Sequence, residues 1–261
     1  MKKKFTAAAL FIFIGAYFFA QSPAAAKTHA PVFQVSTIQA LLGGILDGGT
    51  EYASVAKKGD FGIGTFNHLD GEMIALDGHF YQVRADGHVY PADPSAKTPF
   101  VTVTRFEKDS EFPVSGSPDF KSLLAQIDAK LPTKNIIYAV RAEGEWEYVK
   151  TRSVPAQKKP YPKLEQIVKT QPVFEFHKVR GTLVGFRFPE YMSGLNVPGY
   201  HFHFLTEDKK AGGHVLDLKV SSVTVSLEEC SGLELLFPGD KEFYQADLSG
   251  KDKTALIKVE K

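Results

Sequence analysis

Alternating apolar and polar positions predict β-strands along most of the chain after residue 60. The predicted strands cover residues 61–66, 72–76, 79–83, 100–106, 135–142, 173–179, 182–188, 200–205, 214–225 and 254–259. Asp77 and Gly78 separate the second run from the third, and Asp-Gly between apolar runs is typical of a tight hairpin turn. The first three strands are therefore expected to form an antiparallel meander, which residues 100–106 extend.

Helices are predicted to be few and short. The clearest one has an apolar stripe at helical spacing, formed by Phe120, Leu123, Leu124, Ile127 and Leu131. Ser117 is its expected N-cap, and Pro118 would occupy the first turn. Shorter helices are expected at residues 37–45, 52–58 and 162–168. Because the helices do not alternate regularly with the strands, the pattern favours an α+β fold, in which two packed subdomains of mixed or antiparallel β-sheet carry few short helices.

A proline-rich stretch suggests where the two subdomains meet. Residues 154–162 contain three prolines and two lysines, a composition typical of an exposed connection. We therefore expect a β-rich N-terminal subdomain at residues 27–155 and a β-rich C-terminal subdomain at residues 156–261 that carries the metal site described below. Together they would form one catalytic unit.

The first 26 residues have the features of an export signal. Lysines at positions 2–4 precede an apolar run at residues 7–20, and the alanines at positions 24–26 are small enough for a cleavage site. The apolar run is shorter than the roughly 20 residues that a bilayer core demands, which disfavours the alternative of a transmembrane anchor. After cleavage the chain is expected to be periplasmic or extracellular, without membrane attachment.

Charge and cysteine content exclude several classes of protein. The 31 Lys and Arg residues nearly balance 30 Asp and Glu, so the net charge of +1 provides no positive field for nucleic-acid binding. Cys230 is the single cysteine, which rules out an intramolecular disulfide and any multi-cysteine zinc or iron–sulfur site. A bound metal must therefore be held by histidine and carboxylate side chains.

Three histidines are predicted to converge on two neighbouring strands. His201 and His203 project from the same face of their strand, because side chains alternate along it. If the first and last residues of the polar turn at 207–210 pair, His203 lies opposite His214, and directly paired residues share a face. Neighbouring Cβ atoms would then lie roughly 5 Å apart. Three neutral nitrogens with open positions are typical of catalytic zinc, with non-heme iron as the alternative.

Two other interpretations fit parts of this pattern. His201, His203 and Glu207 match the first motif of metal-dependent cupin oxygenases, in which Glu207 would be a fourth ligand. The second cupin motif requires a histidine after a Pro-x-Gly turn, and no histidine follows residues 238–240. A non-enzymatic, exported domain that binds a metal or another ligand is the second alternative.

Five blocks of sequence, in this order along the chain, are similar to one known family. They cover residues 59–73, 152–157, 160–164, 199–205 and 212–216. In these blocks the chain resembles the alpha-acetolactate decarboxylase family, and the resemblance extends over nearly all of the chain that follows the export signal.

The resemblance implies an active site and a reaction. The three histidines would bind zinc, in preference to Fe²⁺ or another divalent ion, and the catalytic side chains would be Arg152, Glu72 and Glu260. The family converts 2-acetolactate, a small 2-hydroxy-3-oxo acid, into acetoin and carbon dioxide. Zinc would be the Lewis acid that stabilises an enediolate, Arg152 would hold the carboxylate, and the two glutamates would order the hydroxyl and relay a proton. Only one of the two glutamates, directly or through Arg152, would relay the proton, and Arg152 could alternatively hold the developing oxyanion. The resemblance also implies a homodimer.

Overall fold

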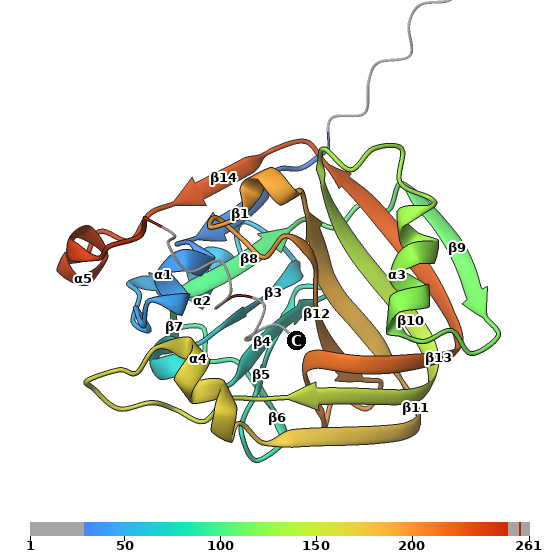
Figure 1. Ribbon diagram of the computed structural model, residues 1–261, viewed down its shortest axis with the longest axis horizontal. Helices are drawn as coiled ribbons and strands as arrows, with labels where there is room; N and C mark the ends of the chain where they lie inside the picture. The colour runs from blue at the N-terminus through green and yellow to red at the C-terminus, as the bar shows by residue number, and fades with distance from the viewer. Residues whose placement is uncertain (1–28, 250–255, 257–261) are drawn as a thin grey trace, which may run out of the picture.

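Seven strands form the first of two packed sheets in the computed structural model, which describes residues 29–249 and Leu256 (Figure 1). From edge to edge they are β14 (Leu233–Leu236), β1 (Val32–Val35), β8 (Phe100–Thr104), β3 (Phe61–Thr65), β4 (Glu72–Leu76), β5 (His79–Val83) and β6 (Val89–Pro91). The predicted meander is confirmed as β3, β4 and β5, and β8 extends it beside β3. Because β1 pairs in parallel with β14 while its pairing with β8 is antiparallel, the sheet is mixed.

Five antiparallel strands form the second sheet. They are β9 (Ser110–Ser115), β10 (Ile137–Arg152), β11 (Val173–Phe188), β12 (Gly199–Thr206) and β13 (Gly212–Cys230). The order is β10-β11-β12-β13-β9, and β10 also pairs with β13 along almost its whole length. Strands β10 to β13 therefore close on themselves. β2 (Thr50–Glu51) and β7 (Lys97–Thr98) form a third sheet of two antiparallel strands.

The helices are short, as predicted, which confirms the α+β class. They are α1 (Ile38–Leu42), α2 (Tyr52–Val55), α3 (Phe120–Asp128), α4 (Leu164–Ile167) and α5 (Lys241–Gln245), with 3₁₀ turns η1 (Asn67–Leu69), η2 (Val168–Thr170) and η3 (Glu190–Met192). Among the described residues, no helix combines the length and apolar character that crossing a membrane requires.

The longest of these helices, α3, begins later than the sequence predicts. Its N-cap is Asp119 instead of Ser117, and the Asp119 carboxylate accepts the N–H of Ser122 at 2.8 Å. Pro118 precedes the helix, where its carbonyl accepts the N–H of Val220 at 3.0 Å. Ser117 has a φ of 60°, which is not the extended conformation typical of an N-cap. Backbone pairing with β13 therefore fixes where the helix can start.

Strand lengths also differ from the prediction. The strands predicted on either side of residues 180–181 are one strand, β11, and the strand predicted at 135–142 continues as β10 to Arg152. Gly181, which resembles a turn signal in the sequence, allows close packing: a Cβ atom there would lie 2.4 Å from the ring of Phe204. The short strands β1, β9 and β14 and helix α5 are not apparent in the hydrophobic pattern.

The chain passes between the two sheets more than once. Strands β9 and β10, which precede residue 155, belong to the five-stranded sheet, whereas β14 returns to the seven-stranded sheet. The division into subdomains at 27–155 and 156–261 stays a prediction, and the sheets exchange strands across it. The export signal at residues 1–26 lies outside the described residues, as does the strand predicted at 254–259 apart from Leu256.

The two faces of β12 serve different purposes. Phe202 and Phe204 pack into a hydrophobic cluster with Trp146. A second cluster fills the space between the two sheets, with members from β3 and β4 on one side and β11 and β12 on the other. His201 and His203 alternate with the two phenylalanines, and Nδ1 of His203 contacts the backbone of β4. The histidine face of β12 is therefore directed towards the seven-stranded sheet.

Gly185 of β11 holds β12 close, and its replacement is expected to affect both stability and the histidine site. A Cβ atom at Gly185 would lie 2.1 Å from the carbonyl oxygen of His201. Gly185→Ala should therefore lower the free energy of unfolding by about 1–3 kcal/mol, because β12 must move. Urea unfolding and the amount of bound metal measure the two effects. Gly49→Ala is the control, since its Cβ would have no neighbour within 4 Å. Equal free energies of unfolding and equal metal contents in the two variants would contradict this expectation.

Candidate metal centre

The turn between β12 and β13 sets the register of the histidines. Thr206 closes it by donating its N–H to the carbonyl of Ala211 at 2.9 Å, and its hydroxyl oxygen accepts the N–H of Ala211 at 3.1 Å. This closure places His203 directly opposite His214 and confirms the predicted register. A local feature of the sequence therefore determines how the two strands present their imidazoles.

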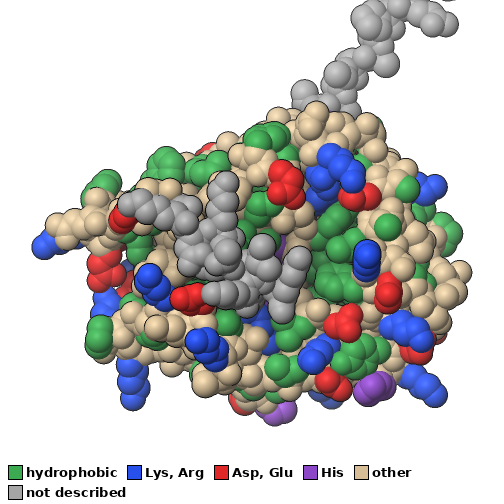
Figure 2. Space-filling model, viewed as in Figure 1, with side chains coloured by type: hydrophobic (Ala, Val, Ile, Leu, Met, Phe, Trp, Pro, Cys, Tyr) green, Lys and Arg blue, Asp and Glu red, His purple; other side chains and the backbone are tan. Residues whose placement is uncertain are grey.

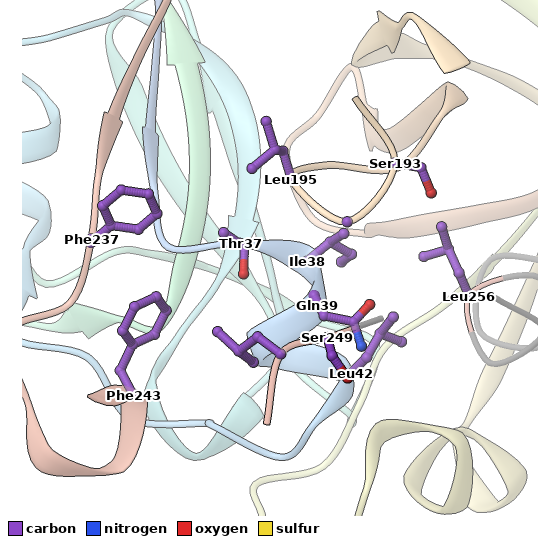
Figure 3. A pocket seen from close by; sticks show the side chains of 12 residues that line it. Thr37, Ile38, Gln39, Leu42, Ser193, Leu195, Phe237, Phe243, Ser249 and Leu256 are labelled. Atoms are coloured by element: carbon purple, nitrogen blue, oxygen red, sulfur yellow. The ribbon is translucent and has the colours of Figure 1, made fainter. Parts of the chain in front are cut away.

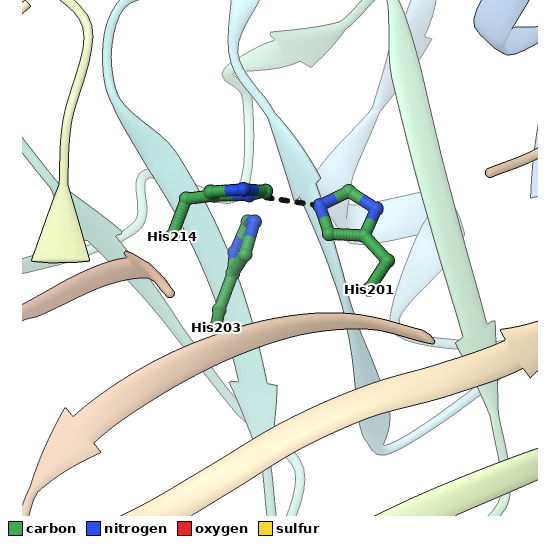
Figure 4. Close-up of side chains that lie close together, drawn as sticks. All are labelled: His201, His203 and His214. Carbon is green, nitrogen blue, oxygen red and sulfur yellow. Dashed lines mark hydrogen bonds between the residues drawn. The ribbon is translucent and has the colours of Figure 1, made fainter. Parts of the chain in front are cut away.

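The three imidazoles project from one face of β12 and β13 and point towards one another (Figure 4). Nε2 of His201 lies 3.0 Å from Nδ1 of His214, and one ligand nitrogen from each of the three rings lies within 4.8 Å of the others. The exposed fraction is 9% for His201, 1% for His203 and 2% for His214. Two nitrogens from β12 and one from β13, gathered in a buried position, are the arrangement of a three-histidine metal site.

Burial keeps these imidazoles neutral, which is the form that binds a metal ion. It lowers the pKa of each histidine, that of His201 to about 3, and the charge of Arg152 lowers these pKa values further. His203 donates its Nδ1–H to the carbonyl of Met73 at 2.9 Å, so its lone pair is on Nε2. That nitrogen has no hydrogen-bond partner among the described residues. A buried lone pair oriented through the other ring nitrogen fits a metal ligand.

Arg152 lies beside the histidines, although more than forty positions separate it from them in the sequence. Arg152 is the last residue of β10 and pairs with His214 on β13. His214 in turn pairs with His203 on β12. The arginine and two of the histidines therefore form one row across three neighbouring strands. The Arg152 side chain is buried, and its Nη1 donates to Oε1 of Gln171 at 2.7 Å. The structure thus brings a buried positive charge to the edge of the metal site.

Glu72 reaches the same site from the other sheet. It is the first residue of β4 and is buried, and its Oε2 lies 3.5 Å from Nε2 of His203. Glu260, the other glutamate implied by the family resemblance, lies outside the described residues. Of the six predicted site residues, the structure therefore brings five together.

Glu207, the fourth ligand expected for a cupin oxygenase, is not part of this site. Its carboxylate is exposed and pairs with Arg180, with Oε2 3.2 Å from the arginine Nε. Glu207 does not line the cavity that holds the histidines. The His-x-His-x-x-x-Glu pattern therefore does not form a cupin ligand set.

A small cavity of about 40 Å³ opens onto the metal site. Its polar side is formed by the three histidines with Glu72, Arg152 and Thr65. Its apolar side is formed by Ile38, Leu41, Leu69, Phe100, Val154 and Leu164. The lining therefore combines a cation, a carboxylate and three neutral imidazoles with apolar side chains.

A larger cavity of about 490 Å³ lies beside α1 (Figure 3). Ile38 lines both cavities, so α1 separates the larger one from the metal site. Phe237 and Phe243 border it, and none of the described residues that line it is a histidine, a cysteine or a charged residue. The described residues that line this larger cavity therefore offer no group for acid–base or metal chemistry.

Sequence reasoning did not find Gln171, Thr65 or the apolar wall of the metal cavity. Gln171 contacts Arg152 from a segment that precedes β11, and Thr65 belongs to β3 of the other sheet. No local pattern marks these residues, because only the packing of the two sheets brings them to the site. A correct prediction of how β10 and β13 pair would have placed Arg152 beside His214.

Comparison with known proteins extends the similarity over most of the chain. A model of the alpha-acetolactate decarboxylase family matches residues 32–250. The alpha-acetolactate decarboxylase of Methanosarcina mazei is 49% identical over 230 residues, which cover 88% of this chain and 80% of that protein. The Bacillus subtilis strain 168 protein of the same name is 41% identical and covers 85% of this chain and 87% of its own. Its crystal structure matches with a TM-score of 0.86 at 40% identity, over 88% of this chain and 98% of that one.

Proposed function

Because the chain belongs to the alpha-acetolactate decarboxylase family and is a carboxy-lyase, we propose that it converts 2-acetolactate into acetoin and carbon dioxide at a zinc ion bound by His201, His203 and His214. One observation carries the proposal. Three buried, neutral imidazoles adjoin a buried arginine and a buried glutamate in a single small cavity. The same geometry would hold Fe²⁺ or another divalent ion, and zinc is the expected one because three nitrogens with an open position suit it.

The metal ligands are prepared by the fold. A divalent ion held by His201, His203 and His214 would supply a Lewis acid that stabilises negative charge on the substrate as carbon dioxide leaves. The Met73 carbonyl fixes the ring of His203 in the tautomer that presents Nε2, and burial keeps all three rings neutral. The side chain of His203 therefore needs little rearrangement to bind an ion.

Arg152 is proposed to hold the substrate carboxylate before it leaves as carbon dioxide. A guanidinium can donate two parallel hydrogen bonds to a carboxylate, which fixes its orientation as well as its position. Because Arg152 shares a row with His214 and His203, this orientation is set relative to the metal ligands. The apolar wall opposite would pack against the methyl groups and exclude water from the reacting carbon.

Glu72 is proposed to order the substrate hydroxyl and to take part in protonating the enediolate. Its Oε2 lies 3.5 Å from Nε2 of His203, within reach of any small molecule at the metal site. Glu260 is the second carboxylate proposed for this relay, on the strength of the family resemblance. One of the two would deliver the proton, directly or through Arg152.

Two further proposals concern the protein as a whole. The lysines, apolar run and alanines of residues 1–26 support export and cleavage after residue 26. The family resemblance supports a homodimer. N-terminal sequencing of the secreted chain and light scattering of the purified chain would test these two proposals separately.

Acetoin formation tests the proposed reaction. The chain starting at residue 27, supplied with zinc and racemic 2-acetolactate, should release acetoin and carbon dioxide in equal amounts without consuming oxygen. Consumption of oxygen would instead support the oxygenase alternative. A chain that binds one zinc ion but forms no acetoin would support the non-enzymatic alternative. Either result would contradict the proposal.

A further inference from the structure

We propose that Gln171 is a positioning residue that holds Arg152 through a neutral hydrogen bond and so leaves the arginine charge available to the substrate carboxylate. This inference rests on the proposed function and adds a residue that determines how strongly the site attracts its anion. Oε1 of Gln171 accepts from Nη1 of Arg152 at 2.7 Å.

Arg152 differs from two other arginines of the five-stranded sheet in what it pairs with. Arg141, on the same strand, contacts the carboxylates of Asp77 and Glu143, each at 2.7 Å. Arg180 likewise pairs with two glutamates. Arg152 is only 3% exposed, yet its hydrogen bond within the described part of the chain goes to an amide, and no ion pair of Arg152 occurs there. A buried arginine is normally paired with a carboxylate, so a neutral partner is the unusual choice.

The backbone holds Gln171 where this contact is possible. Gln171 follows η2, and the N–H of Ser153, the neighbour of Arg152, donates to the carbonyl of Pro172 at 3.3 Å. Val173 then pairs with Arg152 as β11 begins. The two segments are therefore joined through the two residues that follow Gln171, and this pairing holds the amide oxygen beside the guanidinium.

The chemistry of the amide explains why glutamine suits this position. An amide oxygen accepts one hydrogen bond and orients the guanidinium, but it brings no charge that would neutralise it. Nε of Arg152 has no hydrogen-bond partner among the described residues. Its N–H is therefore a buried donor that a substrate carboxylate could accept from. A carboxylate in place of the amide would form an ion pair and compete with the incoming substrate carboxylate.

Replacing the amide by a carboxylate separates this role from a structural one. Gln171→Glu keeps the size and the acceptor, so a purely structural role predicts wild-type kinetics, whereas our proposal predicts a KM about tenfold higher with kcat changed less than about threefold. Gln171→Met removes the acceptor but adds no charge, and its KM should rise less than that of Gln171→Glu. Gln166→Glu is the control for added charge, because Gln166 is exposed on α4.

Binding without turnover distinguishes failure of this inference from failure of the proposed function. The probe is 2,3-dihydroxy-2-methylbutanoate, which has the carboxylate and both oxygens of the substrate but no ketone to accept electrons. Calorimetry on the zinc-loaded chain should show about tenfold weaker binding for Gln171→Glu and wild-type binding for Gln166→Glu. Wild-type affinity in Gln171→Glu, or equal weakening in both variants, would overturn the role of Gln171. Absence of acetoin with the unmodified chain would instead overturn the proposed reaction.

Discussion

Replacing His203 with alanine is expected to abolish zinc retention and to lower kcat for acetoin formation by about a thousandfold or more. A Lewis acid contributes several kcal/mol to the stabilisation of developing charge, and a loss of that size corresponds to roughly this factor. The orientation of the His203 ring is fixed by Met73 and its Nε2 faces Glu72, so its loss removes one of the three proposed ligands. Bound zinc per chain and steady-state kinetics measure the two effects.

His177→Ala is the matched control for this variant. His177 also lies on a strand of the five-stranded sheet, where it is exposed and contacts the ring of Tyr148. This variant should keep its zinc and its activity. A His203→Ala chain that retains one zinc ion and wild-type kcat would show that the three histidines are not the catalytic metal site.

Replacing Arg152 with methionine is expected to lower kcat/KM about a hundredfold while the chain keeps its zinc. Losing a buried, charge-assisted contact to a carboxylate costs about 2–5 kcal/mol, and about 3 kcal/mol is a hundredfold in rate. Zinc should remain because the positive charge of Arg152 lowers the pKa of His201 and does not help to attract a cation. Kinetics and metal content, measured on the same preparation, separate the two roles.

Arg141→Met provides the comparison for this second variant. Arg141 lies on the same strand, but its partners are Asp77 and Glu143 at the surface, so its loss should leave kcat/KM unchanged. Exposed ion pairs of this kind also contribute little to stability. If Arg152→Met lost zinc in proportion to activity, Arg152 would support the metal ligands and not the substrate.

The histidine site was predictable because its geometry is local. Alternation along a strand places His201 and His203 on one face, and the turn at residues 207–210 is short enough to fix the partner of His203. Nothing outside a hairpin of fewer than twenty residues was needed. The convergence of the three histidines could therefore be predicted from the sequence before any tertiary contact was known.

Arg152 and Glu72 were not predictable in the same way, because their positions depend on long-range pairing. Arg152 meets His214 through the register of β10 against β13, which includes several irregularities. Glu72 belongs to the other sheet and reaches His203 only because the two sheets pack face to face. The family resemblance identified both residues, whereas hydrophobic periodicity marked neither.

The fold was predictable where the elements are regular and where no long-range contact determines their position. The meander of β3, β4 and β5 followed from the pattern and from the Asp-Gly turn at Asp77. The start of α3 did not, because pairing of Pro118 with Val220 shifts the cap to Asp119. Strand β14 escaped detection because its four residues become a strand only beside β1, about two hundred positions earlier.

Removal and return of the metal tests the central claim most directly. The purified chain is treated with a chelator, its zinc content is measured, and acetoin formation from racemic 2-acetolactate is followed before and after zinc is restored. We predict that activity disappears with the metal and returns in proportion to bound zinc, up to one ion per chain. Full acetoin formation by a chain shown to contain no metal would contradict the proposed role of His201, His203 and His214.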